Sequence, residues 1–274
     1  MLNAQALPRR IDELLVSGRY EPPVLPEVAQ AVLRETSKAS CEPRRLADIL
    51  KRDAAMAAGV LRMANSPAYA PVSPIVSLSQ AISRLGLEAI RRMAVAVACE
   101  SRLFRVRGRE AEARALYFRS TVGAFVAQEL ARHLRLNVED AFLGGLLHDL
   151  GEIILLGLVA DLEATGSAAP IDAVRAVLSE RHAAVGAAAV EHWALIPRVA
   201  VAIRHHHETE GATDTASASL LFISDHVVAA FLDARPLDAQ ALAPALGRLN
   251  LYFDDLEAVA ARRDELLGWA RGLE

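Results

Sequence analysis

One histidine of this sequence is followed directly by an aspartate inside an apolar stretch: His148 and Asp149 stand between Leu147 and Leu150. Successive helix residues point about 100° apart, so neighbouring imidazole and carboxylate groups can reach one ion from adjacent directions. Burying an ionised aspartate among leucines is costly unless a metal, another cation or several donors compensate its charge. The pair therefore indicates a centre in which the Asp149 carboxylate has a positively charged partner.

Further polar residues with metal-binding or acid–base chemistry follow in the second half of the chain. His182 lies in a stretch rich in Gly and Ala, His206 and His207 end a predicted helix, and Asp225 stands among apolar residues. Each has an ordinary structural explanation when taken alone; imidazoles at a helix C-terminus, for example, are favourable without any function. Together with the His-Asp pair, these positions predict one shared centre.

The elements that must position these residues are predicted to be helices throughout. Of the 274 residues, 53% are hydrophobic and only 5% are aromatic. The apolar residues are largely Ala, Leu and Val, and no strand-like alternation is found. Because Ala and Leu favour helices while strands prefer aromatic and β-branched residues, the sequence predicts an all-α fold.

Charge, hydropathy and cysteine usage exclude several classes of protein. Lys+Arg 30 against Asp+Glu 34 gives a net charge of −4, which leaves no electrostatic footprint for nucleic acid. Apolar runs such as 153–160 are shorter than the roughly 20 residues that cross a bilayer, so no membrane span is expected. Cys41 and Cys99 are too few for a disulfide framework and favour the cytoplasm. The sequence has no phosphate-binding loop, dinucleotide fingerprint or nucleophile elbow.

Three parts are expected along the chain: an N-terminal helical lobe over 1–105, a second helical lobe over 106–228 and a C-terminal helical extension over 229–274. The basic stretch Arg102–Arg109 is interpreted as a solvated connector between the lobes, with binding of an anionic ligand as the alternative. A helical pair over 236–272 is expected to pack against one of the lobes.

Local signals mark several helix ends. Asp53 and Asn137 are predicted N-caps, Ser77 with Gln80 is typical of a capping box, and Gly86 is expected to break its helix. Separate helices are expected at 171–180 and 183–194.

Several motifs, in this order, resemble the HDOD domains, a branch of the HD superfamily of metal-dependent phosphohydrolases. They include Leu61-Arg-Met-Ala-Asn-Ser66, Leu78-Ser-Gln-Ala-Ile-Ser-Arg-Leu-Gly86, Gly144-Gly-Leu-Leu-His-Asp-Leu-Gly151 and Ile203-Arg-His-His-His-Glu208. The resemblance covers roughly residues 20–228. It implies a two-lobed helical architecture with an HD-type helical core, and a role in bacterial signal transduction.

Two departures from the catalytic pattern bear on activity. The resemblance places a metal-binding histidine shortly after an aromatic residue and directly before Ser120, where this chain has Arg119. A guanidinium stays charged and has no lone pair for a metal. After His-Asp-Leu-Gly, the catalytic cyclic-dinucleotide phosphodiesterases usually have Lys, and this chain has Glu152, which would repel a phosphate. Both departures point away from hydrolysis.

We therefore predict a non-catalytic regulatory protein, without a cofactor, in which Arg119 pairs with Asp149 and with Asp225. Its expected partners are proteins of a bacterial signalling pathway, with no nucleic acid and no membrane. The alternative is a metal-dependent phosphohydrolase or phosphodiesterase whose divalent metal is held by His148, Asp149, Asp225 and one of His182, His206 or His207. A nucleotide-sensing module without catalysis stays open as a third interpretation.

Overall fold

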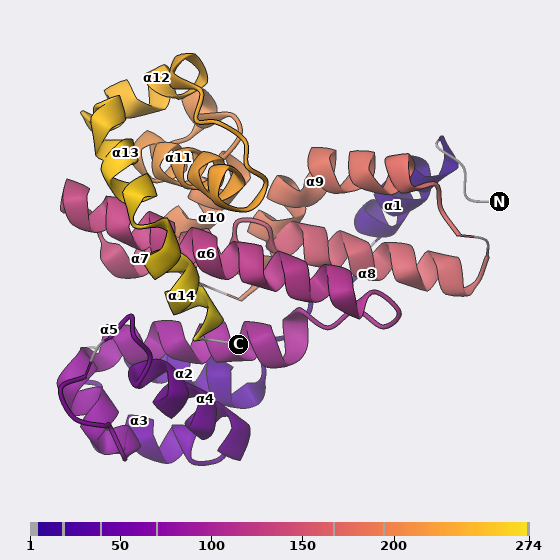
Figure 1. Cartoon of the computed structure of the whole chain (residues 1–274). Helices are drawn as coiled ribbons and strands as arrows, with labels where there is room; N and C mark the ends of the chain where they lie inside the picture. The colour runs from indigo at the N-terminus through magenta and orange to yellow at the C-terminus, as the bar shows by residue number, and fades with distance from the viewer. Residues whose placement is uncertain are drawn as a thin grey trace.

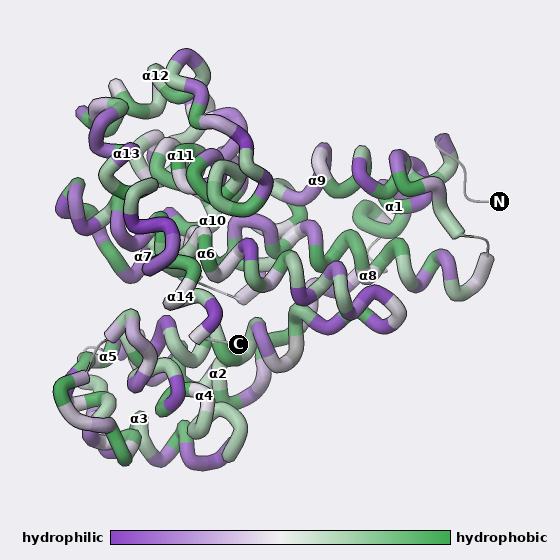
Figure 2. Tube along the Cα trace, in the orientation of Figure 1, coloured by the Kyte–Doolittle hydropathy of each residue, from purple (hydrophilic) through white to green (hydrophobic). Residues whose placement is uncertain are grey.

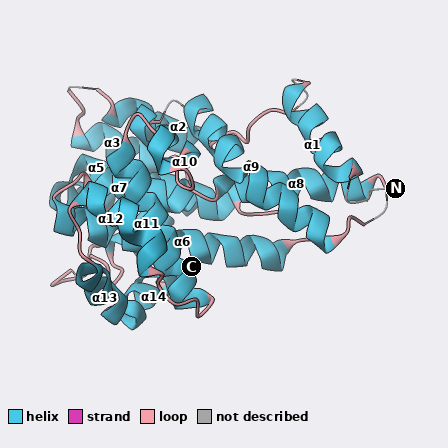
Figure 3. Cartoon of the chain, turned by 90° about the horizontal axis from the view of Figure 1, so that it is seen from above, coloured by secondary structure: helices cyan, strands magenta, loops and turns pink. Residues whose placement is uncertain are grey.

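The computed structural model is built of helices and connecting loops. None of the residues that it describes forms a strand (Figure 3), which confirms the all-α prediction. The structure describes residues 5–17, 20–38, 40–69, 71–166, 168–193 and 195–272.

A smaller group of helices lies at the bottom of Figure 1 and belongs to the first part of the chain. Its helices α2, α3 and α4 pack around the long helix α5. The bounds are α2 Glu27–Thr36, α3 Pro43–Leu50, α4 Ala54–Ala64 and α5 Leu78–Ala98. A short π-helical turn, η1 (Cys99–Leu103), leads from α5 toward the larger group.

The larger group is assembled from helix pairs, α6 with α7 and α8 with α9, and is closed by α10 and α11. The bounds are α6 Glu110–Leu134, α7 Val138–Leu147, α8 Leu150–Ala164, α9 Ile171–His192, α10 Pro197–Arg204 and α11 Thr215–Leu232, with a 3₁₀ turn, η2, at Thr209–Gly211. The prediction of two helices at 171–180 and 183–194 is wrong, because α9 runs unbroken through His182; no residue near 181 breaks the helix.

The two ends of the chain pack on this larger group. Helix α1 (Ala6–Val16) lies against α8 and α9, where Asp12 pairs with Arg181 at 2.7 Å. Helices α12 (Ala239–Leu249), α13 (Phe253–Ala261) and α14 (Arg263–Arg271) follow α11, so the expected C-terminal pair is three helices. Trp269 of α14 packs edge-on against Phe125 of α6. The division of the chain at 105 and 228 stays a prediction.

A buried polar network joins the smaller group to the larger one. Arg92 of α5 is 3% exposed, and its guanidinium contacts Glu139 of α7 at 3.0 Å, Gln128 of α6 at 3.0 Å and the Tyr69 hydroxyl at 2.6 Å. The same guanidinium lies 4.8 Å from the centre of the Phe142 ring. Since an unpaired buried charge is expensive, this network fixes how α5 meets α6 and α7.

Most of the predicted helix ends are found. The carboxylate of Asp53 and the amide of Asn137 accept hydrogen bonds from the first turns of α4 and α7. Gly86 has φ 84° inside α5, a conformation that favours glycine, and interrupts that helix. Ser77 caps α5, but the Gln80 side chain accepts from Val76 instead of Ser77, so only half of the capping box forms.

No membrane span was expected, because the uninterrupted apolar runs of the sequence are short. Two segments, 138–164 and 215–232, are nevertheless long and apolar enough to cross a membrane by length and composition. The first is α7 with α8, and the second is α11, which is largely hydrophobic in Figure 2. The most apolar windows are 83% and 56% buried inside the protein. These helices supply much of the core, which is where a water-soluble protein places such segments.

Candidate functional site

All seven side chains predicted for the centre lie close together; three of them are on helices, and the other four are at the α7–α8 junction and just after α10. Asp149 stands at the junction of α7 and α8, where His148 ends one helix and Asp149 begins the next. The others are Arg119 on α6, His182 on α9, His206 and His207 just after α10, and Asp225 on α11.

Glycines allow the helices to approach closely enough for these side chains to meet. A Cβ added to Gly151 of α8 would collide with the backbone of His182 on α9, and one added to Gly145 of α7 would collide with the backbone of Gly123 on α6. The approach therefore depends on the absence of a side chain at these positions. The Gly-Gly pair at 144–145 packs helices, as its sequence context suggests.

One half of the centre, which we name the carboxylate half, consists of Arg119, His148, Asp149 and Asp225. His148 is buried, with Nε2 3.1 Å from Asp149 Oδ2 and 3.8 Å from Asp225 Oδ1. Its Nδ1 donates to the carbonyl of Gly145 at 2.8 Å, so a proton on Nε2 makes the ring an imidazolium. Burial opposes that charge, but the Asp149 and Asp225 carboxylates outweigh it and raise the pKa of His148.

The Arg119 guanidinium points into this half. It lies 4.0 Å from Asp149 and 3.5 Å from Asp225, as the hypothesis of a replacement cation requires. Its shortest contact is to Asp233, at 3.0 Å, which sequence reasoning missed. Asp233 ends α11 about two turns after Asp225, and a carboxylate at a helix C-terminus is unfavourable without a cation. The unfavourable position of Asp233 at the end of a helix was the sequence signal that could have predicted its pairing with a cation.

Both aspartates of the carboxylate half stay ionised. Burial alone would raise the pKa of Asp225, but the contacts to His148, aided by the charge of Arg119, lower the pKa to about 2. Burial opposes ionisation of Asp149 too, and the charge of His148 lowers its pKa strongly. Two cations, His148 and Arg119, thus face carboxylates that would otherwise repel one another.

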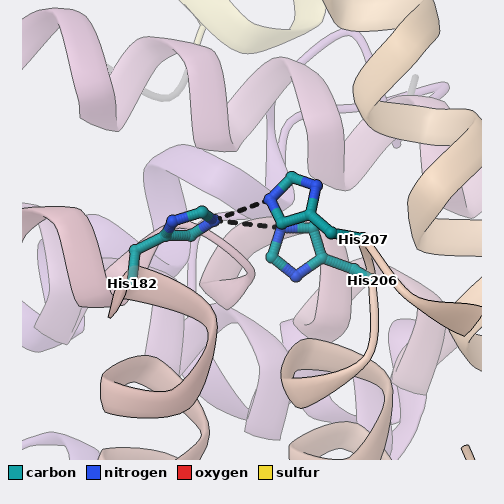
Figure 4. A group of neighbouring side chains, drawn as sticks. All are labelled: His182, His206 and His207. Atoms are coloured by element: carbon teal, nitrogen blue, oxygen red, sulfur yellow. Dashed lines mark hydrogen bonds between the residues drawn. The ribbon is translucent and has the colours of Figure 1, made fainter. Parts of the chain in front are cut away.

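The other half, which we name the histidine half, consists of His182, His206 and His207 (Figure 4). The Nε2 atom of His182 lies 3.3 Å from Nε2 of His206 and 2.9 Å from Nε2 of His207. The Nδ1 atoms of His182 and His206 face backbone carbonyls, of Leu178 at 2.8 Å and Ile203 at 2.6 Å. These carbonyls fix the protons on Nδ1, so the Nε2 lone pairs of His182 and His206 point at each other.

The imidazoles at the end of α10 are neutral. Burial, and then the charge of His148, lower the pKa of His206 to about 3. Burial is also the main reason that the pKa of His207 falls below its ordinary value. Neutral rings with converging lone pairs form a donor set that a proton or a metal cation would satisfy.

Asp149 joins the two halves. Its Oδ1 atom lies 3.6 Å from Nε2 of His182 and 4.0 Å from Nε2 of His206, while Oδ2 faces His148. Glu152, one turn further along α8, is close enough to be affected by the charge of Asp149. Burial, and then the charge of Asp149, raise its pKa to about 7. Near neutral pH, Glu152 is therefore only partly ionised. It occupies the position where, by the resemblance, catalytic cyclic-dinucleotide phosphodiesterases usually have a lysine.

A family model for the HDOD domain matches residues 23–209, about two thirds of the sequence, and the chain belongs to that family. Asp225 and Asp233 lie beyond the matched residues.

Solved structures share the fold over nearly the whole chain. One is a protein from Shewanella amazonensis, provisionally named a metal-dependent phosphohydrolase, with 21% identity, a TM-score of 0.78 and 99% of both chains covered. Another is an HDOD domain protein of unknown function from Geobacter sulfurreducens, with 23% identity, a TM-score of 0.72 and coverage of 97% of this chain and 96% of that one.

An uncharacterised protein of Treponema pallidum is 22% identical over 222 residues, which are 77% of this chain and 41% of that protein. The chain thus spans about two fifths of the length of this relative.

Proposed function

We propose that this chain is a non-hydrolytic regulatory module of bacterial signal transduction that acts through protein partners. The observation that carries the proposal is Arg119, whose guanidinium lies within 4.0 Å of Asp149, Asp225 and Asp233. It supplies the positive charge that a metal would supply and offers no lone pair to replace it. The carboxylate half is therefore a closed structural ion-pair network.

The two halves of the centre differ in how well their residues would hold a metal. The carboxylate half does not fit one while Arg119 stays in place, because a divalent cation would have to sit beside a guanidinium. The histidine half does fit a divalent transition metal: three Nε2 atoms converge, and two rings are oriented by backbone carbonyls. His182, His206 and His207 would hold it, with Asp149 alongside. A metal bound there would supply Lewis acidity.

The second candidate function is that of a metal-dependent phosphohydrolase, and the geometry of the histidine half favours it. A metal held there by His182, His206 and His207 would supply Lewis acidity next to Asp149 and His148, which is part of what a hydrolytic centre needs. Against it stand Arg119 and Glu152, whose carboxylate repels a phosphate whenever it is ionised.

Turnover measurements separate the two functions. Purified protein is incubated with bis(p-nitrophenyl) phosphate, cyclic dinucleotides and nucleotides, in the presence of Mn²⁺ or Fe²⁺, beside a His148→Ala variant. We expect no turnover above that of the variant. Metal-dependent turnover that His148→Ala abolishes would overturn the proposal and establish the second candidate.

An Arg119→His variant tests whether Arg119 prevents metal binding in the carboxylate half. It adds an imidazole beside His148, Asp149 and Asp225 and removes the competing charge, so we expect it to bind about one more Mn²⁺ per chain than the wild type after dialysis, measured by elemental analysis. Arg44→His on α3, whose arginine is exposed and forms no ion pair with a described residue, is the matched control. Equal metal content in wild type and Arg119→His would contradict the role assigned to Arg119.

The site of action proposed for this module is the cytoplasm. Cys41 and Cys99 are both free thiols, and Cys99 is completely buried, where burial raises its pKa to about 12 and makes it unreactive. The proposed partners are proteins, with neither nucleic acid nor a membrane among them, in keeping with the net charge of −4 and with the burial of the apolar helices.

A further inference from the structure

A second candidate site lies away from the centre, where the chain passes from the smaller helix group to the larger one. A cleft of about 630 Å³ opens between η1, the following loop and the start of α6. It is lined by Glu100, Phe104, Arg105, Val106, Arg107, Glu110, Arg114 and Tyr117. The cleft contains half of the basic stretch 102–109 that the sequence singled out as a connector.

Three arginines give this cleft its charge. Arg105, Arg107 and Arg114 are all exposed, and none forms an ion pair with a described residue. Arg109, in the same basic stretch, differs from them because it pairs with Glu112 and Glu163. Like charges gathered in one cleft repel each other, and an anion placed among them would relieve the repulsion.

The acidic residues of the cleft offset the charges of these arginines only in part. Glu100 pairs with Arg62 at 3.1 Å. Glu110 accepts a hydrogen bond from the backbone N–H of Gly108 at 2.9 Å, and this bond is the main reason that the pKa of Glu110 is lowered. The nearby charges of Arg114 and Arg107 lower it further. Both carboxylates are therefore committed to local structure, and the cleft keeps its free guanidinium groups.

The wall behind the arginines is apolar and rigid. The rings of Phe104 and Tyr117 pack edge to face with centroids 5.2 Å apart, and Val106 is buried beside them in the cleft. A largely apolar wall with a few converging charged groups, at the junction between two packed units, is typical of small-molecule sites. Guanidinium groups bind phosphate oxygens in a bidentate manner better than any other side chain.

We propose that this cleft binds a small organic molecule with at least two phosphate groups, of the class of nucleoside diphosphates and triphosphates. Three guanidinium groups match two or more phosphate charges, and the wall formed by Phe104, Val106 and Tyr117 gives the organic part an apolar surface. The site is separate from the His-Asp centre and does not depend on the function proposed for that centre. Arg114 and Arg119 both lie on α6, so one helix connects the cleft to the centre.

The overall charge favours a small ligand over a nucleic acid. The chain carries a net charge of −4, so it repels an extended polyanion at long range, while a compact phosphate ligand responds to the local field of the cleft.

Isothermal titration calorimetry of the full chain with ADP, GTP, inorganic pyrophosphate and sodium sulfate tests the proposal. We expect saturable binding of a nucleotide that is tighter than that of pyrophosphate, no saturable binding of sulfate, and an affinity that falls as salt rises. No saturable binding of either nucleotide would overturn the proposal. Equal affinities for nucleotide and pyrophosphate would also overturn it, because the apolar wall would then contribute nothing.

Variants locate the binding. A triple Arg105→Gln, Arg107→Gln, Arg114→Gln variant is expected to lose at least tenfold in affinity, and the matching triple Lys variant, which keeps the charges but not the forked donors, is expected to lose less. Arg44→Gln, at an exposed and unpaired arginine of α3, is the control and should bind as the wild type does. The unliganded melting temperature shows that each variant is folded. Unchanged affinity in the folded triple Gln variant would assign the ligand elsewhere.

Discussion

The two halves of the centre lie side by side and share Asp149, yet they solve the same electrostatic problem differently. In the carboxylate half, acidic groups face cations that the protein itself supplies, His148 and Arg119. In the histidine half, the Nε2 atoms of three imidazoles face one another, and no described side chain fills the space between them with a positive group. One half is complete as folded, and the other is a donor set that a cation would complete.

This contrast shows how much of the centre a single guanidinium can balance. A guanidinium at position 119 closes the side that it reaches, where three carboxylates converge on it. It does not reach His206 or His207, whose positions are fixed by α10 and by a backbone carbonyl.

The largest effect is expected when the halves are forced apart. In Gly151→Ala, the new methyl group would collide with the backbone of His182, so α8 and α9 must separate and the free energy of unfolding should fall by about 3 kcal/mol or more. Urea denaturation measures this change. Gly157→Ala on the same helix has open space around its Cβ and should be neutral or stabilising. Equal stability of the two variants would contradict the close packing of α8 on α9.

The next effect concerns a metal. Zn²⁺ or Ni²⁺ at about 100 times its dissociation constant should stabilise the wild type by about 2.7 kcal/mol through the histidine half. His182→Ala should abolish that stabilisation, whereas Asp233→Asn should leave it unchanged, because Asp233 contacts Arg119 and not the histidines. Thermal unfolding with and without metal measures both. Loss of the effect in Asp233→Asn alone would place the metal in the carboxylate half.

Removal of the internal cation should come third. Arg119→Ala leaves Asp149, Asp225 and Asp233 without their shared partner, and we expect a loss of about 2 kcal/mol, below the cost for a fully buried pair because Arg119 is 23% exposed. Urea denaturation at neutral pH measures the loss, with Arg44→Ala as the control. Mn²⁺ should restore part of the stability of Arg119→Ala and none to the wild type. An unchanged midpoint would show that Arg119 carries no structural charge balance.

Per pH unit, the smallest effect is a pH dependence of opposite sign in the two halves. The pKa of His206 is lowered to about 3, so the unfolded chain binds the extra proton and stability falls as the pH drops from about 6.5 toward 3, by up to about 1.4 kcal/mol per pH unit for that proton. The pKa of His148 is raised, so its contribution is present below about pH 6.5 and is lost as the pH rises through its folded-state pKa.

Imidazole NMR signals of the metal-free protein report these two states directly. At about pH 7 we expect the His148 ring to be protonated and the His206 ring to be neutral. His206→Asn should reduce the loss of stability in acid more than His148→Asn, which removes only one of the causes that lower the pKa of His206. If both rings titrate near pH 6.5, the two halves do not differ in this electrostatic respect and the prediction is wrong.

Much of the fold could be predicted from the sequence because its signals are local. The small apolar residues and the caps at Asp53 and Asn137 predict helices, and these form where they were expected. The order of the motifs around the His-Asp pair led to the family. Two helix boundaries were not predicted correctly. The helix α9 is continuous through His182, where no proline or glycine breaks it, and the boundary between α13 and α14 near 262 carries no proline or glycine signal.

The sequence by itself determined which chemical groups are available: a His-Asp pair, further histidines, Asp225, and an arginine where the resemblance expects a ligand. Only the tertiary structure decided how those groups are divided. Asp233 joins Arg119 because α11 ends beside α6, and Asp149 meets His182 because Gly151 lets α8 approach α9. Sequence fixes charge and lone pairs residue by residue. The compensation of a buried charge depends on distances of a few ångström between helices far apart in the chain, and packing alone sets those distances.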